Sequence, residues 1–379
     1  MSKLRLLVGT RKGAWTISTD SERSKWQIEG PMHLGAVVSH YVADPRTQGV
    51  QMMSVGSGHL GPSVFISKDF GGSWSEATTP PAFSVEPSGV ERSVDHVFWL
   101  TPGHVSEPNT WYAGTSPQGL FKSVDGGDTW QEVLGFNHHP DFFEWRGGDK
   151  DGTPDGPKLH SVIVDHSDKN HLLLGMSSGG IFESFDAGAT WSALNSGVAM
   201  DFYPPKEDGS EYEFGHDPHC LIMHPQDANR LYHQNHCGLY ALDRSTGTRW
   251  TRIGDNMPKE VGDIGFPIVV HPRDPNTIWV FPMDGSGQWP RTSPAGRPAV
   301  YCSRDGGASF IRQAKGFPEQ QAWWTVKRQC MAVDGMDSLG VYLGTSNGQL
   351  WGSVDAGENW QPIAMDLPQI FSIEVEISP

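Results

Sequence analysis

Histidines stand at positions where they could form a metal site. His96, His160 and His219 each precede an apolar run, and His236 follows one. Imidazole nitrogens bind zinc, manganese, iron and copper, and a nearby carboxylate can orient such a ligand. Asp217, two residues before His219, is suitably placed for that role. We take His96, His160 and His219 to occupy equivalent positions around one rim, and we predict that these three and His236 bind a divalent transition metal (zinc, manganese or iron). Because no compact motif such as H-E-x-x-H is present, the alternative is that these histidines cap strand ends.

Charged and aromatic residues in the intervening segments could bind a substrate without a metal. Guanidinium groups bind carboxylates through two parallel hydrogen bonds, and carboxyl groups serve as general acids and bases. The predicted catalytic residues are Asp217, Glu144 and Arg328. The predicted substrate-binding residues are Arg11, Lys12, His59, Arg146, Gln234, Asn235, Trp289, Arg291 and Trp324. The alternative is that the charges are solvated and the aromatic rings pack the loops. His171 is expected in an exposed loop.

An eight-residue pattern predicts the elements that must position these residues. It reads SKDFGGSW from Ser67, SVDGGDTW from Ser123, SFDAGATW from Ser184, SRDGGASF from Ser303 and SVDAGENW from Ser353. In the shared S-x-D-x-G-x-x-W/F, Ser and Asp can bond the backbone of a tight turn, and Gly adopts conformations that other residues resist. Each copy therefore predicts a turn that closes a β-hairpin, with the final aromatic wedged between sheets.

This pattern resembles the Asp-box (BNR) repeat of sialidase-like β-propellers. The resemblance implies an all-β propeller. That superfamily includes sialidases and other glycosidases, oligosaccharide lyases, photosystem assembly factors and sorting receptors, so the fold alone does not name an activity. No F/Y-R-I-P segment precedes the first copy, which argues against sialidase catalysis.

Extending the alignment outward from each copy gives a unit of four strands. A degenerate copy, in which Asp243 and Ser245 have exchanged places, and an early unit ending near Trp26 bring the count to seven. The N-terminus starts at the second strand of a unit, and residues 370–379 read as an isolated first strand. We therefore predict one domain, residues 1–379, that forms a seven-bladed β-propeller closed by its C-terminal strand, which leaves no exposed sheet edge. Six blades is the alternative.

The topology of such a blade also predicts where the site lies. The start of the inner strand, the loop between the second and third strands, and the connection from the previous blade share one face. The repeat turns lie on the other face. Because all the predicted site residues fall in the first three places, we expect the site opposite the repeat turns, among long connections that commonly carry function.

Composition limits the partners and the compartment. The chain has 28 Lys and Arg against 44 Asp and Glu, a net charge of −16, which argues against nucleic acid and anionic membranes as partners. Neither a membrane-spanning apolar run nor the features of a signal peptide is found, so a cytoplasmic protein is expected. The four cysteines show no C-x-x-C spacing, and buried free thiols are expected.

These patterns leave three functional hypotheses. The first is a metal-assisted hydrolase or lyase acting on a small polar molecule, anionic or sugar-like, in a histidine-lined funnel. The second is a non-catalytic scaffold or assembly factor that binds a ligand or protein on the same face. The third is a glycoside hydrolase that uses paired carboxylates.

Overall fold

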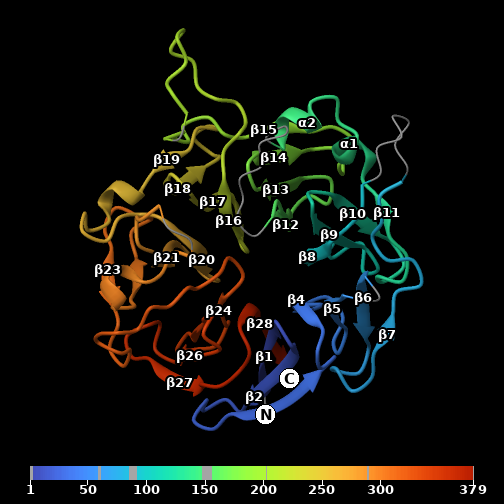
Figure 1. Cartoon of the computed structure of the whole chain (residues 1–379), viewed down its shortest axis with the longest axis vertical. Coiled ribbons are helices and arrows are strands. Elements are labelled where there is room, and N and C mark those ends of the chain that lie inside the picture. The colour runs from blue at the N-terminus through green and yellow to red at the C-terminus, as the bar shows by residue number, and fades with distance from the viewer. Residues whose placement is uncertain are drawn as a thin grey trace. The chain divides into compact units, whose positions relative to one another are not determined.

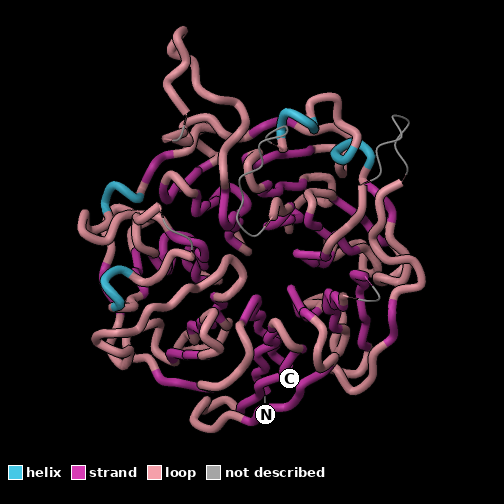
Figure 2. The backbone as a smooth tube through the Cα atoms, in the orientation of Figure 1, coloured by secondary structure: helices cyan, strands magenta, loops and turns pink. Residues whose placement is uncertain are grey.

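The chain folds into seven four-stranded sheets. The computed structural model describes residues 3–58, 61–84, 92–146, 156–201, 203–287 and 290–378 (Figures 1 and 2). The seven sheets are the blades of an all-β, seven-bladed β-propeller, so the predicted fold and blade number are confirmed. By their contacts the residues divide into two compact units, Met1–Ala193 with Glu374–Pro379, and Leu194–Ile373.

The first unit contains four blades and two short helices. In spatial order its strands are β28 (Ile370–Ser378, of which Glu374 onward belongs to this unit), β1 (Lys3–Thr10), β2 (Gly13–Thr19) and β3 (Gln27–Met32); β4 (Val37–Ala43), β5 (Gln51–Ser57), β6 (Gly61–Ser67) and β7 (Ser75–Glu76); β8 (His96–Pro102), β9 (Trp111–Ser116), β10 (Leu120–Ser123) and β11 (Gln131–Glu132); and β12 (Leu159–Val164), β13 (Leu172–Met176), β14 (Gly180–Ser184) and β15 (Ser192–Ala193). The helices are α1 (Leu134–Asn137) and α2 (Phe142–Trp145).

The second unit contains three blades. Its strands are β16 (Pro218–His224), β17 (Asp227–Asn235), β18 (Gly238–Asp243) and β19 (Thr251–Arg252); β20 (Gly265–His271), β21 (Asp274–Pro282), β22 (Val300–Ser303) and β23 (Ile311–Gln313); and β24 (Met331–Val333), β25 (Val341–Gly344), β26 (Leu350–Ser353) and β27 (Gln361–Ala364). Two 3-10 turns, η1 (Gly254–Asn256) and η2 (Pro294–Gly296), complete it. Within the described ranges, no helix has both the length and the apolar character needed to cross a membrane.

The C-terminal strand completes the N-terminal blade. Strand β28 lies beside β1, as predicted, and polar side chains fasten it there. Arg5 Nη1 donates to Glu376 Oε2 at 3.1 Å and to Ser378 Oγ at 3.2 Å. Gln51 Nε2 donates to the same Glu376 oxygen at 2.8 Å. Because Glu376 and Gln51 are buried, these bonds act where water cannot replace them.

The repeat turns connect the third and fourth strands of their blades, as predicted. In one of them Ser123 Oγ donates to Asp125 Oδ1 at 2.8 Å, and the amides of Gly127 and Thr129 donate to Ser123 Oγ and Asp125 Oδ1 at 2.9 and 3.0 Å. Trp130 is buried, and its indole N–H donates to the Gly127 carbonyl. The same three bonds recur in the turns that begin at Ser67, Ser184, Ser303 and Ser353. The pattern therefore has a structural role, because its Ser and Asp side chains accept hydrogen bonds from the backbone amides of the turn.

Removing this device is expected to destabilise the fold without altering the site. Asp125→Ala leaves the Thr129 amide and two hydroxyl groups without an acceptor, so the free energy of unfolding should fall by about 1–3 kcal/mol. Urea unfolding measures the loss. Val124→Ala, an exposed change in the same turn, is the control and should shift the free energy by less than about 0.5 kcal/mol. An unchanged stability for Asp125→Ala would contradict the structural role.

All four cysteines are buried free thiols, as predicted. They are Cys220, Cys237, Cys302 and Cys330. Burial raises the pKa of Cys237 to about 11 and those of Cys302 and Cys330 to about 12. At neutral pH these three side chains are therefore protonated and poorly nucleophilic.

Candidate functional site

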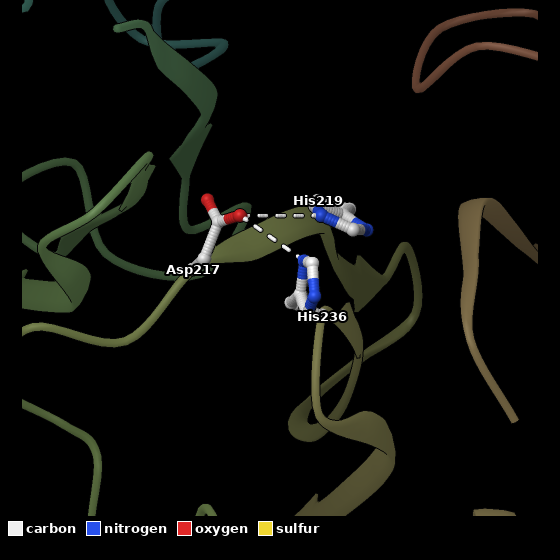
Figure 3. A group of neighbouring side chains, drawn as sticks. All are labelled: Asp217, His219 and His236. Carbon is white, nitrogen blue, oxygen red and sulfur yellow. Dashed lines mark ion pairs between the residues drawn. The ribbon is translucent and has the colours of Figure 1, made fainter. Parts of the chain in front are cut away.

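Three of the side chains predicted for the site converge in the second unit. Asp217 immediately precedes β16, His219 is the second residue of β16, and His236 lies in the turn between β17 and β18. One carboxylate oxygen, Asp217 Oδ2, lies 3.4 Å from His219 Nε2 and 3.7 Å from His236 Nδ1 (Figure 3). One ligand atom from each of the three residues lies within 4.8 Å of the other two.

The β16–β17 ladder brings Asp217 and His236 together. Pro218 is paired with Asn235, and one step further the amide of His236 donates to the carbonyl of Asp217 at 2.9 Å. The interblade connection that carries Asp217 and the hairpin turn that carries His236 therefore meet at the start of β16. This juxtaposition follows from the hydrogen-bonded register of antiparallel strands.

His219 is held in one orientation by the neighbouring blade. Its Nδ1 lies 2.6 Å from the carbonyl oxygen of Gly265, the first residue of β20, and its ring lies 4.6 Å from that of Phe266. Since a carbonyl oxygen only accepts, Nδ1 carries the proton, and in the neutral tautomer Nε2 presents its lone pair toward Asp217. The side chain of His219 is 4% exposed, against 21% for Asp217 and 39% for His236. His219 is therefore the buried and fixed member of the cluster, and His236 is the member most exposed to solvent.

Two arginines place positive charge beside the cluster. Arg291 Nη2 lies 3.4 Å from His236 Nε2, and its Nη1 donates to the carbonyl of Asp284 at 3.2 Å. The guanidinium of Arg328 lies 5.2 Å from the centroid of the Phe266 ring and acts electrostatically on Asp217 and His219. Both arginines were predicted from the sequence.

These neighbours set the charge of the cluster. Burial by itself would raise the pKa of Asp217, but the two facing imidazoles and the Arg328 guanidinium hold that pKa well below 3.8. Burial lowers the pKa of His219 below 6.5, although Asp217 opposes the shift. At neutral pH the cluster therefore consists of an ionised carboxylate facing a neutral buried imidazole.

His96 and His160 belong to the first unit and have partners of their own. His96 Nδ1 lies 2.6 Å from Asp95 Oδ2, and His160 Nδ1 lies 2.9 Å from Ser161 Oγ. His160 is fully buried.

The strand registers set His96 apart from the other two histidines. A β-bulge interrupts each inner strand, between Val97 and Trp99 in β8, between His160 and Ile163 in β12, and between Pro218 and Cys220 in β16. His96 precedes its bulge and is paired with Ser116, His160 borders its bulge and is paired with Gly175, and His219 lies within its bulge. Because a bulge adds one residue and successive side chains alternate between faces, similar sequences do not place their histidines alike.

Three predicted substrate-binding residues, Gln234, Asn235 and Trp324, are buried. Gln234 is buried, and its Nε2 donates to three backbone carbonyls, at 3.2 Å to Asn235, 3.2 Å to Gly238 and 2.7 Å to Asp263. Trp324 is 1% exposed and packs against the rings of Phe317 and Trp351 at centroid distances of 5.2 and 5.3 Å, so it is not a pocket wall. Asn235 is also buried, and its Oδ1 accepts the Cys237 amide.

The remaining predicted residues belong to the first unit or lie outside the described chain. Arg11 and Lys12 are exposed in the turn between β1 and β2, Glu144 is exposed in α2, and Arg146 follows α2 with its guanidinium 4.9 Å from the Phe143 ring. His59 and Trp289 lie outside the described residues. Glu144 stays a prediction.

His171 is buried, which the sequence did not lead us to expect. Its Nδ1 and Nε2 lie 2.7 Å from Asp165 Oδ2 and 2.7 Å from Glu183 Oε1, and its ring stacks on Phe185 at a centroid distance of 4.6 Å. The expectation of an exposed loop is therefore wrong. The available signal was its position directly before the apolar run of β13, where a side chain enters the core.

Comparison with known proteins finds relatives among xyloglucanases. No family model matches the chain. A Neosartorya fischeri protein named as a probable oligoxyloglucan-reducing end-specific xyloglucanase is 24% identical over 287 residues, 69% of this chain and 32% of the relative. A Paenibacillus sp. xyloglucanase is 22% identical over 69% of this chain and 25% of its own length. The chain thus spans a quarter to a third of the length of these curated relatives.

Solved structures show the same fold. The GH74 xyloglucanase from Xanthomonas campestris is 17% identical and superposes with a TM-score of 0.66, over 96% of this chain and 52% of that one. The Niastella koreensis GH74 enzyme gives 0.54 at 16% identity, over 97% and 65%. YCF48 from Cyanidioschyzon merolae gives 0.50 at 14% identity, over 88% and 87%. These similarities agree with the β-propeller fold.

Proposed function

We propose that this protein is a glycoside hydrolase that acts on xyloglucan or a related oligosaccharide. The observation that supports it is the similarity to named xyloglucanases across 69% of the chain. The proposal adopts the third hypothesis drawn from the sequence in preference to a metal-assisted hydrolase or lyase. The substrate is a polar sugar, as the sequence led us to expect.

Asp217 is the anionic centre of the proposed site. Glycoside hydrolysis passes through a transition state in which the sugar ring carries positive charge, and two carboxyl groups commonly serve the reaction. Because the pKa of Asp217 lies well below 3.8, this group is ionised at neutral pH and cannot be the proton donor. Asp217 would instead face the developing positive charge or act on water.

A paired substitution tests this proposal. We expect the full chain to release reducing ends from xyloglucan, and Asp217→Asn to lower kcat about 100-fold or more with little change in Tm. Asp208→Asn is the matched control, because Asp208 lies in the same interblade connection but is exposed, and its Oδ1 accepts from the amide and hydroxyl of Ser210. It should retain activity.

The same assay separates hydrolysis from binding alone. Affinity electrophoresis in gels that contain xyloglucan measures retention of the protein. Retention without hydrolysis would replace the enzyme with the ligand-binding scaffold, and neither retention nor hydrolysis on xyloglucan and its oligosaccharides would refute the proposed function.

A further inference from the structure

The geometry points to a mononuclear metal site formed by Asp217 Oδ2, His219 Nε2 and His236 Nδ1, which would take a divalent ion of the zinc type. This inference concerns the cluster that the proposed function also uses, and a bound metal would make Asp217 a ligand in place of a free catalytic carboxylate. Metal binding is measured on the protein without a substrate, so the two proposals can fail separately. Two of the ligands were predicted from the sequence as metal-binding histidines. The third, Asp217, was predicted as a catalytic residue and joins them here as a ligand.

The spacing of the three atoms fits a metal ion between them. Zinc lies about 2.0–2.1 Å from imidazole nitrogen and carboxylate oxygen, so two ligands at a tetrahedral angle lie about 3.3 Å apart. The observed separations from Asp217 Oδ2 are 3.4 Å to His219 and 3.7 Å to His236. Both are longer than a normal N–H···O bond of 2.7–3.2 Å. The side chains thus converge at the distance expected of ligands to one ion.

Two other histidines, His171 and His96, approach carboxylates more closely. His171 approaches Asp165 and Glu183 at 2.7 Å, and His96 approaches Asp95 at 2.6 Å. In those pairs an N–H donates directly to the carboxylate. The cluster at Asp217 differs because one oxygen faces two imidazoles and reaches neither at that distance (Figure 3).

The orientation of His219 supports coordination through Nε2. Its Nδ1–H is committed to the Gly265 carbonyl at 2.6 Å, so Nε2 is the ring nitrogen that faces Asp217 Oδ2, at 3.4 Å. A backbone carbonyl that fixes the second nitrogen is a common support for metal-bound histidine.

The ligand set favours a particular class of ion. Two imidazoles and one carboxylate suit zinc or ferrous iron rather than calcium or magnesium, which prefer oxygen ligands. Three protein ligands leave a position open for water or a substrate oxygen, as in catalytic zinc sites. Coordination by His236 Nδ1 would place the ring proton on Nε2 and give up the 3.4 Å contact with Arg291, whose guanidinium keeps its bond to Asp284.

Titration of the untagged full chain with zinc, after the protein has been stripped with a chelator, tests the site. We expect calorimetry to give one zinc ion per chain, and cobalt to give the visible absorption of a four-coordinate ion. Asp217→Asn and His236→Ala should each weaken zinc binding about tenfold or more. His236 is half-exposed on a turn, so its loss should leave Tm nearly unchanged.

His138→Ala is the matched control. His138 Nε2 lies 3.4 Å from Glu132 Oε2, the same separation as between His219 and Asp217, but without a second imidazole within 4.8 Å among the described residues. Zinc binding should survive this substitution. Failure of the parent chain to bind zinc, or equal binding by the parent, Asp217→Asn and His236→Ala proteins, would overturn the proposed site. Loss of hydrolysis on xyloglucan would not bear on it.

Discussion

Deletion of residues 370–378 is expected to leave the chain unable to fold as a stable monomer. The deletion removes β28, and with it the strand beside β1 and the partners of Arg5 and Gln51 around Glu376. It also removes Ile370 and Ile373, which are buried. Exposed sheet edges pair with other chains, so the truncated protein should aggregate or melt far below the parent. Size-exclusion chromatography and thermal unfolding measure both effects.

A point variant in the same strand provides the control for this truncation. Ile377 is exposed, and Ile377→Ala removes a side chain without breaking the strand, so its stability should stay within about 0.5 kcal/mol of the parent. A truncated chain that stayed monomeric with the parent Tm would show that β28 does not hold the N-terminal blade.

The second large effect is expected at His171. Both ring nitrogens lie 2.7 Å from a carboxylate, and all three side chains are no more than 7% exposed. His171→Ala would leave Asp165 and Glu183 buried without their shared partner, which is expected to cost about 3–5 kcal/mol of unfolding free energy. Urea unfolding at pH 7 measures the loss. His166→Ala, an exposed change in the same hairpin, is the control and should have little effect.

The same contacts predict a pH dependence. Burial acts to raise the pKa of Asp165, but the bonds from His171 and Ser167 hold it below 3.8. A carboxyl group whose pKa is lower in the folded state stabilises the fold above pH 3.8 and loses this contribution as the pH falls through the folded value. Below about pH 4, the free energy of unfolding of the His171→Ala protein should therefore fall less steeply with decreasing pH than that of the parent. Equal slopes would contradict this account.

The sequence was sufficient for the blades because their signals are local. The repeat turn at Ser123 is fixed by bonds within seven residues, so the pattern alone identifies it. Asp217 and His236 could be predicted to share a face because hairpin pairing follows from the order of the strands. The fold and the location of one cluster therefore followed from residue types and spacing.

The rest of the site depended on features that residue spacing does not encode. Residue spacing does not show where a bulge falls, and the bulge decides the register of a histidine: His160 is paired with Gly175, whereas His219 lies within the bulge of its strand. The bridge made by His171 joins Asp165 to Glu183, which lies on β14, so it exists only once three strands are paired. Gln234 was predicted to bind substrate because its partners cannot be read from the sequence. Its amide donates to backbone carbonyls, among them that of Asp263, which approach it only in the folded chain.

The burial of the cysteines has a practical consequence for spectroscopy. Thiol reagents attack the thiolate, and the high pKa values of Cys237, Cys302 and Cys330, with the burial of Cys220, leave little native thiolate within reach at neutral pH. A cysteine introduced at an exposed position such as Val105 or Ser210 should then react with maleimides selectively, without removal of the native residues. A chain labelled at two such positions would report the distance between the two labels, and its buried native cysteines would remain in place.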